Sequence, residues 1–290
     1  MNTAIDITVI TPFYKGNAYM EGLFGCMRRN AQTAEGIGIE LVLVNDSPGI
    51  PIEYRQEWVS GFALQILENP ENSGIQKTRI NGLKNARGTF VMFLDQDDLL
   101  ADNALLSLFQ CSNQADVVVG NGINENRDRV KPIYHSLAHQ KQVAYPRFYY
   151  SVGCMIVSPG QCLIRKNKIP DVWYEKCVDC NGADDYFLWL LMHDTCRWTV
   201  NPEILYTHVD TGENLSVDID RMLRSSCEAL ALLKQEGKLS ARQEKIAKRR
   251  FRMRKFYEGR QAWRKAVACL MYPDLFLELL LYTGLKKLCR

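Results

Sequence analysis

The sequence predicts an α/β fold in which a mainly parallel sheet is flanked by helices. Short apolar, β-branched segments alternate with segments of helical periodicity over the first hundred residues. This alternation requires right-handed crossovers between parallel strands. Three of the first four predicted strands also end in polar, chemically reactive residues, at the edge where ligands bind to such sheets. The composition, 47% hydrophobic and 24% charged over 290 residues, excludes a disordered chain, a collagen-like repeat and a coiled coil.

Four strands and three helices are predicted in the first part of the chain. The strands cover residues 5–10, 39–44, 62–67 and 89–94, and the helices cover residues 19–34, 54–61 and 74–86. The turn-forming segment Asn45–Gly49 closes the second strand, and Gly88 ends the third helix. A further helix is predicted over 99–109, with Asp97 or Asp98 available as its N-cap.

The second half of the chain is less regular. We predict a strand at Asp116–Gly120, a long polar loop over 121–147 and a strand, a turn and a strand over 152–164. A helix over 184–193 begins with two adjacent aspartates, and a basic amphipathic helix covers Arg242–Lys265. A short apolar segment, Leu275–Leu285, follows this helix.

The charge of the chain is unevenly distributed. The net charge is +3, but Arg242–Lys265 holds 11 basic and 2 acidic residues, a local +9 that leaves −6 on the rest. A basic amphipathic helix followed by an apolar segment is typical of an interfacial anchor, so 242–285 is expected to contact an anionic membrane surface. The alternatives are that this segment packs on the preceding part of the chain or forms a homodimer contact. No nucleic-acid partner is expected, because no nucleic-acid-binding fold accompanies the basic stretch.

The cysteines and the N-terminus favour a cytoplasmic location. Ten cysteines are too few for a disulfide scaffold, and Met1–Asp6 lacks the basic and apolar parts of a signal peptide. No apolar run reaches the ~18 residues of a membrane-spanning helix. The protein is therefore expected in the cytoplasm, or peripherally on the inner face of the cytoplasmic membrane.

One set of residues has approximately the spacing of zinc ligands. The set consists of Cys177, Cys180, His193 and Cys196. Ordinary reduced cysteines are the favoured interpretation, because His193 falls near the end of the helix predicted over 184–193, which begins with two aspartates.

Asp95, Asp97 and Asp98 place three carboxylates within one turn after the fourth strand. Carboxylates this close repel one another unless a cation compensates them. Mg²⁺ and Mn²⁺ bind to one or two carboxylates together with ligand phosphates, so a metal–diphosphate site is expected here. A helix cap accounts for one or two of these aspartates but not for all three.

Residues 72–98 resemble glycosyltransferase family 2, which has the GT-A fold. They follow the family pattern N-x-G-x-x-x-A-R-N-x-G, A-x-G, an apolar strand and D-x-D-D without a gap, although Ile80 replaces the second Asn. The strand end Thr11–Tyr14 also matches, Asn45-Asp46-Ser47 is close to the family's D-D-G-S, and Asp184–Leu190 is similar to its E-D-Y-x-L-W-L. The resemblance covers about residues 5–216.

The resemblance implies a role for each matching residue. The residues expected to bind the donor are Thr11, Pro12, Phe13, Tyr14, Asp46, Gly74, Arg79, Asp95 and Gln96. Asp97 is expected to hold Mn²⁺ or Mg²⁺, and Asp185 to deprotonate the acceptor. A later segment with His208, Asn214 and Ser216 resembles Y-R-x-H-x-x-N-x-S, which places His208 near the metal or the diphosphate.

These observations predict a metal-dependent inverting glycosyltransferase. It would move a sugar from a UDP-sugar to a hydroxyl of a lipid-linked saccharide or a polysaccharide. The catalytic domain is predicted at 1–220, divided into a nucleotide-binding half (1–110) and an acceptor half (111–220), and the helical extension at 221–290. A sugar nucleotidyltransferase is an alternative, although the first strand is not followed by a G-x-G-T-R-like loop. A non-catalytic relative is another, although Asp97 and Asp185 are intact.

Overall fold

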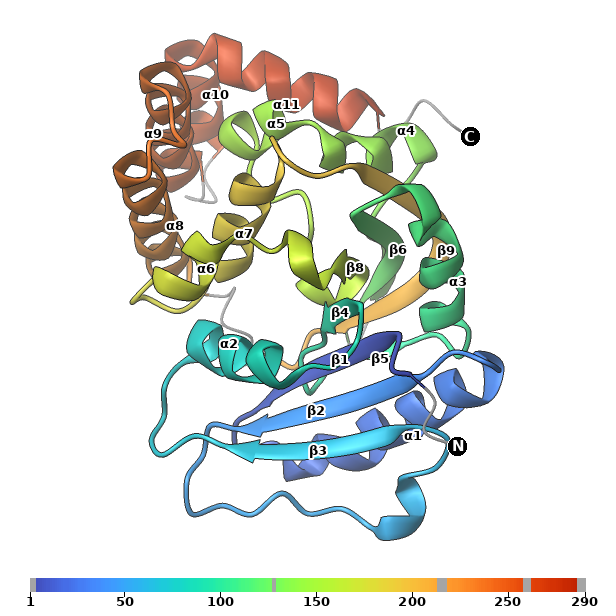
Figure 1. Ribbon diagram of the computed structural model, residues 1–290. Helices are drawn as coiled ribbons and strands as arrows, with labels where there is room; N and C mark the ends of the chain where they lie inside the picture. The colour runs from blue at the N-terminus through green and yellow to red at the C-terminus, as the bar shows by residue number, and fades with distance from the viewer. Residues whose placement is uncertain (1–3, 127–128, 213–217, 258–261, 286–290) are drawn as a thin grey trace.

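The computed structural model describes residues 4–126, 129–212, 218–257 and 262–285. Its core is one mixed sheet, whose strands within these residues have the order β3-β2-β1-β4-β8-β6-β9-β5, with β7 paired to β6 (Figure 1). The strands are β1 (Ile7–Phe13), β2 (Ile39–Asn45), β3 (Ala63–Glu68), β4 (Phe90–Phe93), β5 (Leu99–Leu100), β6 (Val117–Asn126), β7 (Arg129–Pro132), β8 (Cys162–Arg165) and β9 (Trp198–Val209).

Helices cover the sheet and extend beyond it at the C-terminus. They are α1 (Asn17–Thr33), α2 (Ile75–Asn85), α3 (Ala104–Gln110), α4 (Leu137–Gln140), α5 (Pro146–Ser151), α6 (Asp171–Glu175), α7 (Asp184–Met192), α8 (Ile219–Gln235), α9 (Ala241–Tyr257), α10 (Ala262–Met271) and α11 (Pro273–Leu285). This architecture confirms the predicted α/β fold with a helical extension at the C-terminus.

The first four strands are parallel and form the half of the sheet predicted most directly from the sequence. β1 lies between β2 and β4, and β3 pairs with β2. All seven residues of β2 are buried, which explains the apolar run Leu41–Val44 in this strand. α2 packs closely on β1 at Gly82, where a Cβ atom would lie 2.4 Å from Ile10 Cγ2. The ends of β1, β2 and β4 therefore meet at one edge of the sheet.

The second half of the sheet is mixed and less well predicted. β8 is antiparallel to both β4 and β6, whereas β9 runs parallel to β6. The segment 121–147, expected to be a loop, instead continues β6 to Asn126, turns back as β7 and then forms α4 and α5. Its polar side chains are compatible with a strand because β7 is exposed along its whole length.

Three other predicted elements differ from the structure. The helix expected over 54–61 is one 3-10 turn at Gln56–Trp58. The helix expected over 99–109 begins only at Ala104, because Leu99 and Leu100 form β5 and pair with β9. The region 152–164 contains one strand, β8, preceded by a turn at 159–161. At β5 and β8, pairing with other strands overrides local periodicity.

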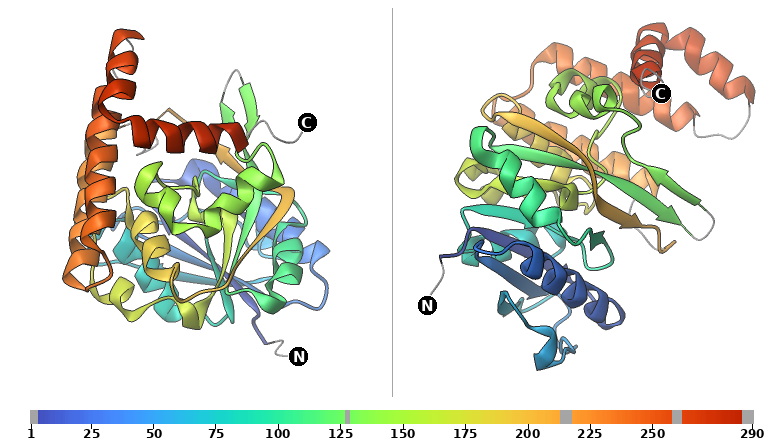
Figure 2. Two further views of the ribbon diagram at one scale, coloured as in Figure 1. Left: turned by 90° about the horizontal axis from the view of Figure 1, so that it is seen from above. Right: turned by 90° about the vertical axis from the view of Figure 1, so that its right-hand side faces the viewer.

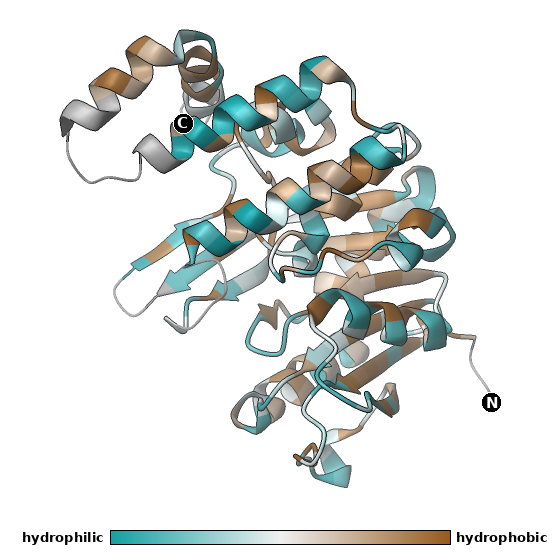
Figure 3. Cartoon of the chain, turned by 90° about the vertical axis from the view of Figure 1, so that its left-hand side faces the viewer, coloured by the Kyte–Doolittle hydropathy of each residue, from teal (hydrophilic) through white to brown (hydrophobic). Residues whose placement is uncertain are grey.

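The C-terminal helices lie along one side of the molecule and over its top (Figure 2). α9 packs on α5 and α8 packs on α7. The basic helix expected over 242–265 is divided between α9 and α10, and residues 258–261 lie outside the described part. The strands are mostly hydrophobic, whereas α8 and α9 carry hydrophilic residues along their length (Figure 3). Within the described residues, none of the helices combines the length and the apolar character needed to cross a membrane.

Candidate functional site

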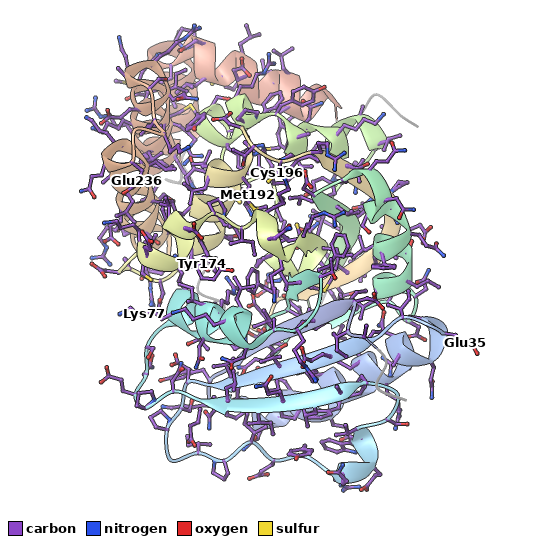
Figure 4. All side chains as sticks on the ribbon, in the orientation of Figure 1. Glu35, Lys77, Tyr174, Met192, Cys196 and Glu236 are labelled. Carbon is purple, nitrogen blue, oxygen red and sulfur yellow. The ribbon has the colours of Figure 1, made fainter. Side chains whose placement is uncertain are left out.

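The predicted site residues gather at the carboxyl ends of β1, β2 and β4 and at the first turn of α7. Asp46 follows β2, Asp95 and its neighbours follow β4, and Asp185 lies in the first turn of α7. α2 closes one side of the site and contacts α6 through Gln76, whose amide donates to the carbonyls of Trp173 (3.1 Å) and Lys176 (3.0 Å). Lys77 of α2 and Tyr174 of α6 mark these two helices in Figure 4.

Asp46 is buried and organises the loop before α2. Its Oδ1 accepts from the Asn69 side chain (2.8 Å) and from the backbone N–H of Ser73 (2.7 Å). Its Oδ2 accepts from the backbone N–H of Gly74 (3.0 Å). Asn69 also donates to Thr78 Oγ1 at 3.1 Å, so β2, this loop and α2 are joined through one amide.

Gly74 begins α2 in a conformation that only glycine adopts easily. Its φ is +84°, and a Cβ atom there would lie 2.7 Å from Asn181 Oδ1. The same Oδ1 accepts from the N–H of Ile75 at 3.3 Å. The start of α2 therefore contacts the loop that leads into α7, which is the acceptor side of the expected site.

Arg79 lies deeper than an exposed nucleotide contact would. It is 3% exposed, and its Nη2 donates to Asp95 at 2.5 Å while its Nη1 donates to Asp184 at 2.7 Å. Burial opposes its charge, but Asp95 and Asp184 together raise the pKa of Arg79 above its ordinary value. Arg79 thus joins the end of β4 to the start of α7.

The three clustered carboxylates have different partners. Asp95 pairs with Arg79, whereas Asp98 is buried and accepts from the Tyr206 hydroxyl, from the Val209 N–H (3.1 Å) and from the His208 ring (Nδ1, 3.1 Å). His208 therefore lies beside this cluster and contacts Asp98 rather than Asp97, while its expected place near the metal or the diphosphate stays a prediction. Asn214 and Ser216, which the sequence places with His208, lie outside the described residues.

Asp97 is the carboxylate of this cluster with the fewest partners. Burial raises its pKa to about 6, with further contributions from Asp98 and Asp95, and its own backbone N–H acts in the opposite direction. Among the described residues, no three His, Cys, Asp or Glu side chains form a complete metal-binding group. The Asp97 oxygens nevertheless fit a hard divalent ion that takes its remaining ligands from phosphate and water.

Gln96, between Asp95 and Asp97, holds the residue that follows β1. Its Oε1 accepts from the Tyr14 N–H at 3.0 Å, and its Nε2 donates to the Tyr14 carbonyl at 3.1 Å. The Tyr14 side chain remains 47% exposed and can stack on a base. Thr11 and Phe13 are fully buried, so that only their backbone can meet a ligand, and Pro12 is half-buried.

Asp185 has the electrostatic environment of a general base. Burial raises its pKa to about 7, Asp184 adds to this rise, and Arg79 opposes it. Its Oδ1 accepts from the N–H of Tyr186 at 2.6 Å. A carboxylate with a pKa near neutrality is matched to accepting a proton at physiological pH.

The residues with zinc-like spacing do not form a metal group within the described residues. His193 lies between aromatic rings instead, with centroid distances of 4.5 Å to Tyr149 and 4.6 Å to Trp198. Burial lowers its pKa to about 3. Cys180 contacts α8, where its backbone N–H donates to Glu228 at 2.9 Å.

Three residues that hold the site together are not predicted from the sequence. Asn69, Asn181 and Tyr206 contact Asp46, the start of α2 and Asp98, respectively. Asn69 follows β3 directly, so its place at a strand end was the only available signal. Asn181 lies in a loop that shows no recognisable pattern.

Comparisons with known proteins agree with this geometry. The family model described as "Glycosyl transferase family 2" matches residues 8–173. A minor teichoic acid biosynthesis protein, GgaB of Bacillus subtilis, is 32% identical over 122 residues, which are 39% of this chain and 13% of that protein. An uncharacterised glycosyltransferase of Haemophilus influenzae is 30% identical over 102 residues, 34% of this chain and 39% of that protein. The chain therefore spans well under two thirds of these relatives.

Two solved structures share the fold. The S. aureus TarS 1–349 complex with UDP-GlcNAc superimposes with a TM-score of 0.65 and 18% identity, covering 95% of this chain and 80% of that one. The mannosyltransferase PcManGT of Pyrobaculum calidifontis, solved with GDP-Man and Mn²⁺, superimposes with a TM-score of 0.58 and 17% identity. This match covers 98% of this chain and 82% of that one. The family model covers more than half of the sequence. The chain belongs to glycosyltransferase family 2.

Proposed function

We propose that this protein is a metal-dependent, inverting glycosyltransferase that moves a sugar from a UDP-sugar to a hydroxyl of a lipid-linked saccharide or a polysaccharide. The proposal depends mainly on the two ion pairs of Arg79, which we call the Arg79 bridge. It joins Asp95, in the cluster suited to a metal–diphosphate, to Asp184, the neighbour of a carboxylate whose pKa is about 7. Donor-side and acceptor-side groups thus belong to one buried network.

The nucleotide would lie against the ends of β1 and β2. Tyr14 offers an exposed ring for the base, Pro12 and the backbone of Thr11 and Phe13 form the adjoining wall, and Asp46 with Gly74 would meet the uracil side. Asp95 would face the ribose. In this arrangement Gln96 and Arg79 act mainly by holding Tyr14 and Asp95 in position.

Asp97, with His208 behind it, would hold Mn²⁺ or Mg²⁺. His208 uses Nδ1 toward Asp98, so Nε2 is the ring atom it can offer to a ligand. When bound, the ion would neutralise charge on the donor diphosphate. The crystallised mannosyltransferase relative with GDP-Man and Mn²⁺ supports this part of the proposal.

Asp185 would carry out the proton transfer. The acceptor hydroxyl attacks the anomeric carbon, its proton passes to a carboxylate oxygen of Asp185, and the bond from the sugar to the diphosphate breaks with release of UDP. A single attack from the face opposite the leaving group inverts the anomeric centre. The raised pKa of Asp185 lets it accept this proton near neutral pH.

The test is a donor screen by thermal shift, followed by an assay of nucleotide release. UDP-GlcNAc, UDP-glucose and GDP-mannose are each added with Mn²⁺ or with EDTA. We expect a UDP-sugar to raise the melting temperature only when metal is present, because ligands that bind the folded state stabilise it. Asp97→Asn should remove this shift, and Asp185→Asn should keep the shift but lose UDP release. UDP release by Asp185→Asn at the wild-type rate would exclude Asp185 as the base.

The same preparation separates the two rival functions. A sugar nucleotidyltransferase would release pyrophosphate from UTP when a sugar phosphate is supplied. A non-catalytic relative would bind a UDP-sugar without releasing UDP under any condition. Either result would overturn the proposed activity.

We further propose that α11 contacts an anionic membrane surface. Leu277, Leu280 and Leu281 form an exposed apolar stripe on this helix, and Leu270 and Met271 at the end of α10 are also exposed. Spacing of three and four residues places such side chains on one face of a helix. The neighbouring α9 supplies exposed basic residues, which favours anionic lipid over a neutral surface.

Vesicle flotation tests this surface. The full chain should float with phosphatidylglycerol-containing vesicles and less with pure phosphatidylcholine, and Leu277→Asp with Leu280→Asp should abolish flotation. Val130→Asp, at an exposed apolar position on β7, is the matched control. If flotation fails and sedimentation shows a dimer that the same two substitutions dissociate, the stripe is a homodimer contact.

A further inference from the structure

Arg250 is a buried cation contributed by the C-terminal extension. It lies on α9, outside the region that matches the family model, and is 5% exposed. Among the described residues no carboxylate forms a salt bridge with it, and burial lowers its pKa. Burying a charge without an opposite charge is unfavourable unless hydrogen bonds satisfy it. Its position therefore calls for a specific explanation.

The Arg250 guanidinium is held by α5 and α7. Its Nη1 donates to the backbone carbonyl of Tyr149 at 2.8 Å, and the Tyr186 hydroxyl donates to the same carbonyl at 2.9 Å. Burial raises the pKa of Tyr186, while the charge of Arg250 and a side-chain hydrogen bond from it act in the opposite direction. The guanidinium carbon lies 5.5 Å from the centre of the Tyr186 ring.

The backbone beside α5 makes room for this side chain. Gly153 has a φ of +143°, and a Cβ atom there would lie 3.3 Å from Arg250 Nη1. Asp185 and Arg250 both lie close enough to the Cys154 thiol for their charges to act on its pKa, in opposite directions.

Tyr186 connects this arrangement to the expected base. Its hydroxyl donates to the Tyr149 carbonyl, which also accepts from Arg250, and its backbone N–H donates to Asp185 Oδ1 at 2.6 Å. The side chain of one residue thus joins Arg250 of α9 to the first turn of α7. A shift of the Tyr186 ring would move the peptide that orients the Asp185 carboxylate.

We propose that Arg250 is a positioning residue for Asp185. The inference rests on the proposed function, in which Asp185 is the base, and assigns to α9 a role in catalysis besides that of an attachment surface. In this proposal Arg250 has no part in donor binding and fixes the acceptor side of the site through Tyr149 and Tyr186. Its loss should therefore lower the rate of the chemical step without weakening donor binding.

The test compares variants of the full chain with UDP-GlcNAc and Mn²⁺ as the probe, or with whichever donor the thermal-shift screen selects. Arg250→Gln should lower kcat by about tenfold or more, because small misplacements of a reacting group have effects of this size. The donor KM and the thermal shift produced by UDP should stay within about twofold of wild type. Arg250→Lys should recover part of kcat, since an ammonium group can still donate to the Tyr149 carbonyl.

Two further variants make the result specific. Arg252→Gln removes the same charge from an exposed position on α9 and should leave kcat unchanged. Tyr186→Phe removes the hydroxyl that connects Arg250 to α7 and should lower kcat as well. The double variant Arg250→Gln, Tyr186→Phe should be no slower than the slower single variant, because both changes break one connection.

Amide hydrogen exchange gives a readout that does not depend on turnover. Exchange in residues 184–188 should accelerate in Arg250→Gln and in Tyr186→Phe but not in Arg252→Gln. Unchanged exchange together with unchanged kcat in Arg250→Gln would overturn the positioning role. Equal losses in donor affinity and kcat would overturn it too, by showing a general loss of structure. Absence of UDP release from the wild type with every donor would instead overturn the proposed function, while exchange still tests the contact.

Discussion

Arg79, which is expected to contact the nucleotide, holds two of the protein's own carboxylates. It is buried, and its two terminal nitrogens bind to carboxylates from β4's end and from α7. A guanidinium suits this task because it can donate in two directions from one plane. Its removal would leave the buried Asp184 carboxylate without its cation.

We therefore expect Arg79→Gln to lower the free energy of unfolding by about 3 kcal/mol, because breaking a buried ion pair leaves an uncompensated charge. Urea denaturation at pH 7.5 measures this loss. Arg29→Gln is the control, since Arg29 pairs with Asp102 at an exposed position and should change stability by less than about 1 kcal/mol. Equal effects of the two substitutions would contradict the structural role of Arg79.

The pH dependence of activity should report Asp185. A base must be ionised to accept a proton, and its pKa in the free protein is about 7, so kcat/KM should rise with pH up to about 7 and then level off. Rates of UDP release between pH 5.5 and 8.5 measure this profile. Arg79 favours the ionised form of Asp185. Arg79→Lys should therefore move the rise in kcat/KM to higher pH if the lysine ammonium group reaches only one of Asp95 and Asp184. A flat profile would exclude Asp185 as the group that titrates.

At the level of elements, the loops between strands and helices form the site. The loop after β2 is fixed by Asp46, the loop after β4 by Arg79 and Tyr206, and the start of α2 by Asn181. Each loop takes at least one partner from a distant part of the chain. A change at one loop is therefore expected to affect the others.

Gly74→Ala tests the contact between the start of α2 and the loop before α7. Alanine at a positive φ is strained by about 1 kcal/mol, and at this position the added Cβ would also meet Asn181. We expect the thermal shift produced by a UDP-sugar to weaken and the melting temperature to fall. Gly36→Ala has a similar φ but nothing within 4 Å, so it isolates the strain. Identical behaviour of the two variants would show that the Asn181 contact has no effect.

The sequence predicts helices and strands well where burial sets the pattern of apolar residues. It predicts them poorly where pairing with a distant strand determines the structure. α1 and α2 have one buried face each, and α7 is buried along almost its whole length; the apolar pattern of all three placed them within a few residues of the observed bounds. The segment 121–147 was expected to be a loop because it is polar, yet β6 and β7 pair there. Leu99 and Leu100 have a helix-like pattern, but β9 takes them into the sheet.

On the scale of the whole molecule, one continuous apolar core joins the catalytic region to the C-terminal helices. Leu230 and Leu233 of α8 and Ala247 and Phe251 of α9 belong to the same buried cluster as the residues of the sheet. The predicted division at residue 220 thus marks a change of architecture within one core. A smaller second cluster joins Met253 to α10 and α11.

A shared core predicts that α8 and α9 unfold together with the sheet. Urea denaturation followed by far-ultraviolet circular dichroism and by tryptophan fluorescence should give coincident transitions, because contacts across the cluster make unfolding cooperative. Hydrogen exchange in α9 should have the same urea dependence as exchange in β1. An early transition that releases α8 and α9 while β1 remains protected would contradict this expectation.

The sequence by itself determined the fold class and the family, because burial patterns and strand-end motifs are local properties of the chain. It placed Asp95, Asp97 and Asp185 correctly at the ends of their elements. Only the tertiary structure decided what these groups contact. The Arg79 bridge spans 105 residues to Asp184, and Arg250 lies 101 residues from the carbonyl of Tyr149. Such pairings depend on how the sheet and helices pack, and no local pattern encodes them.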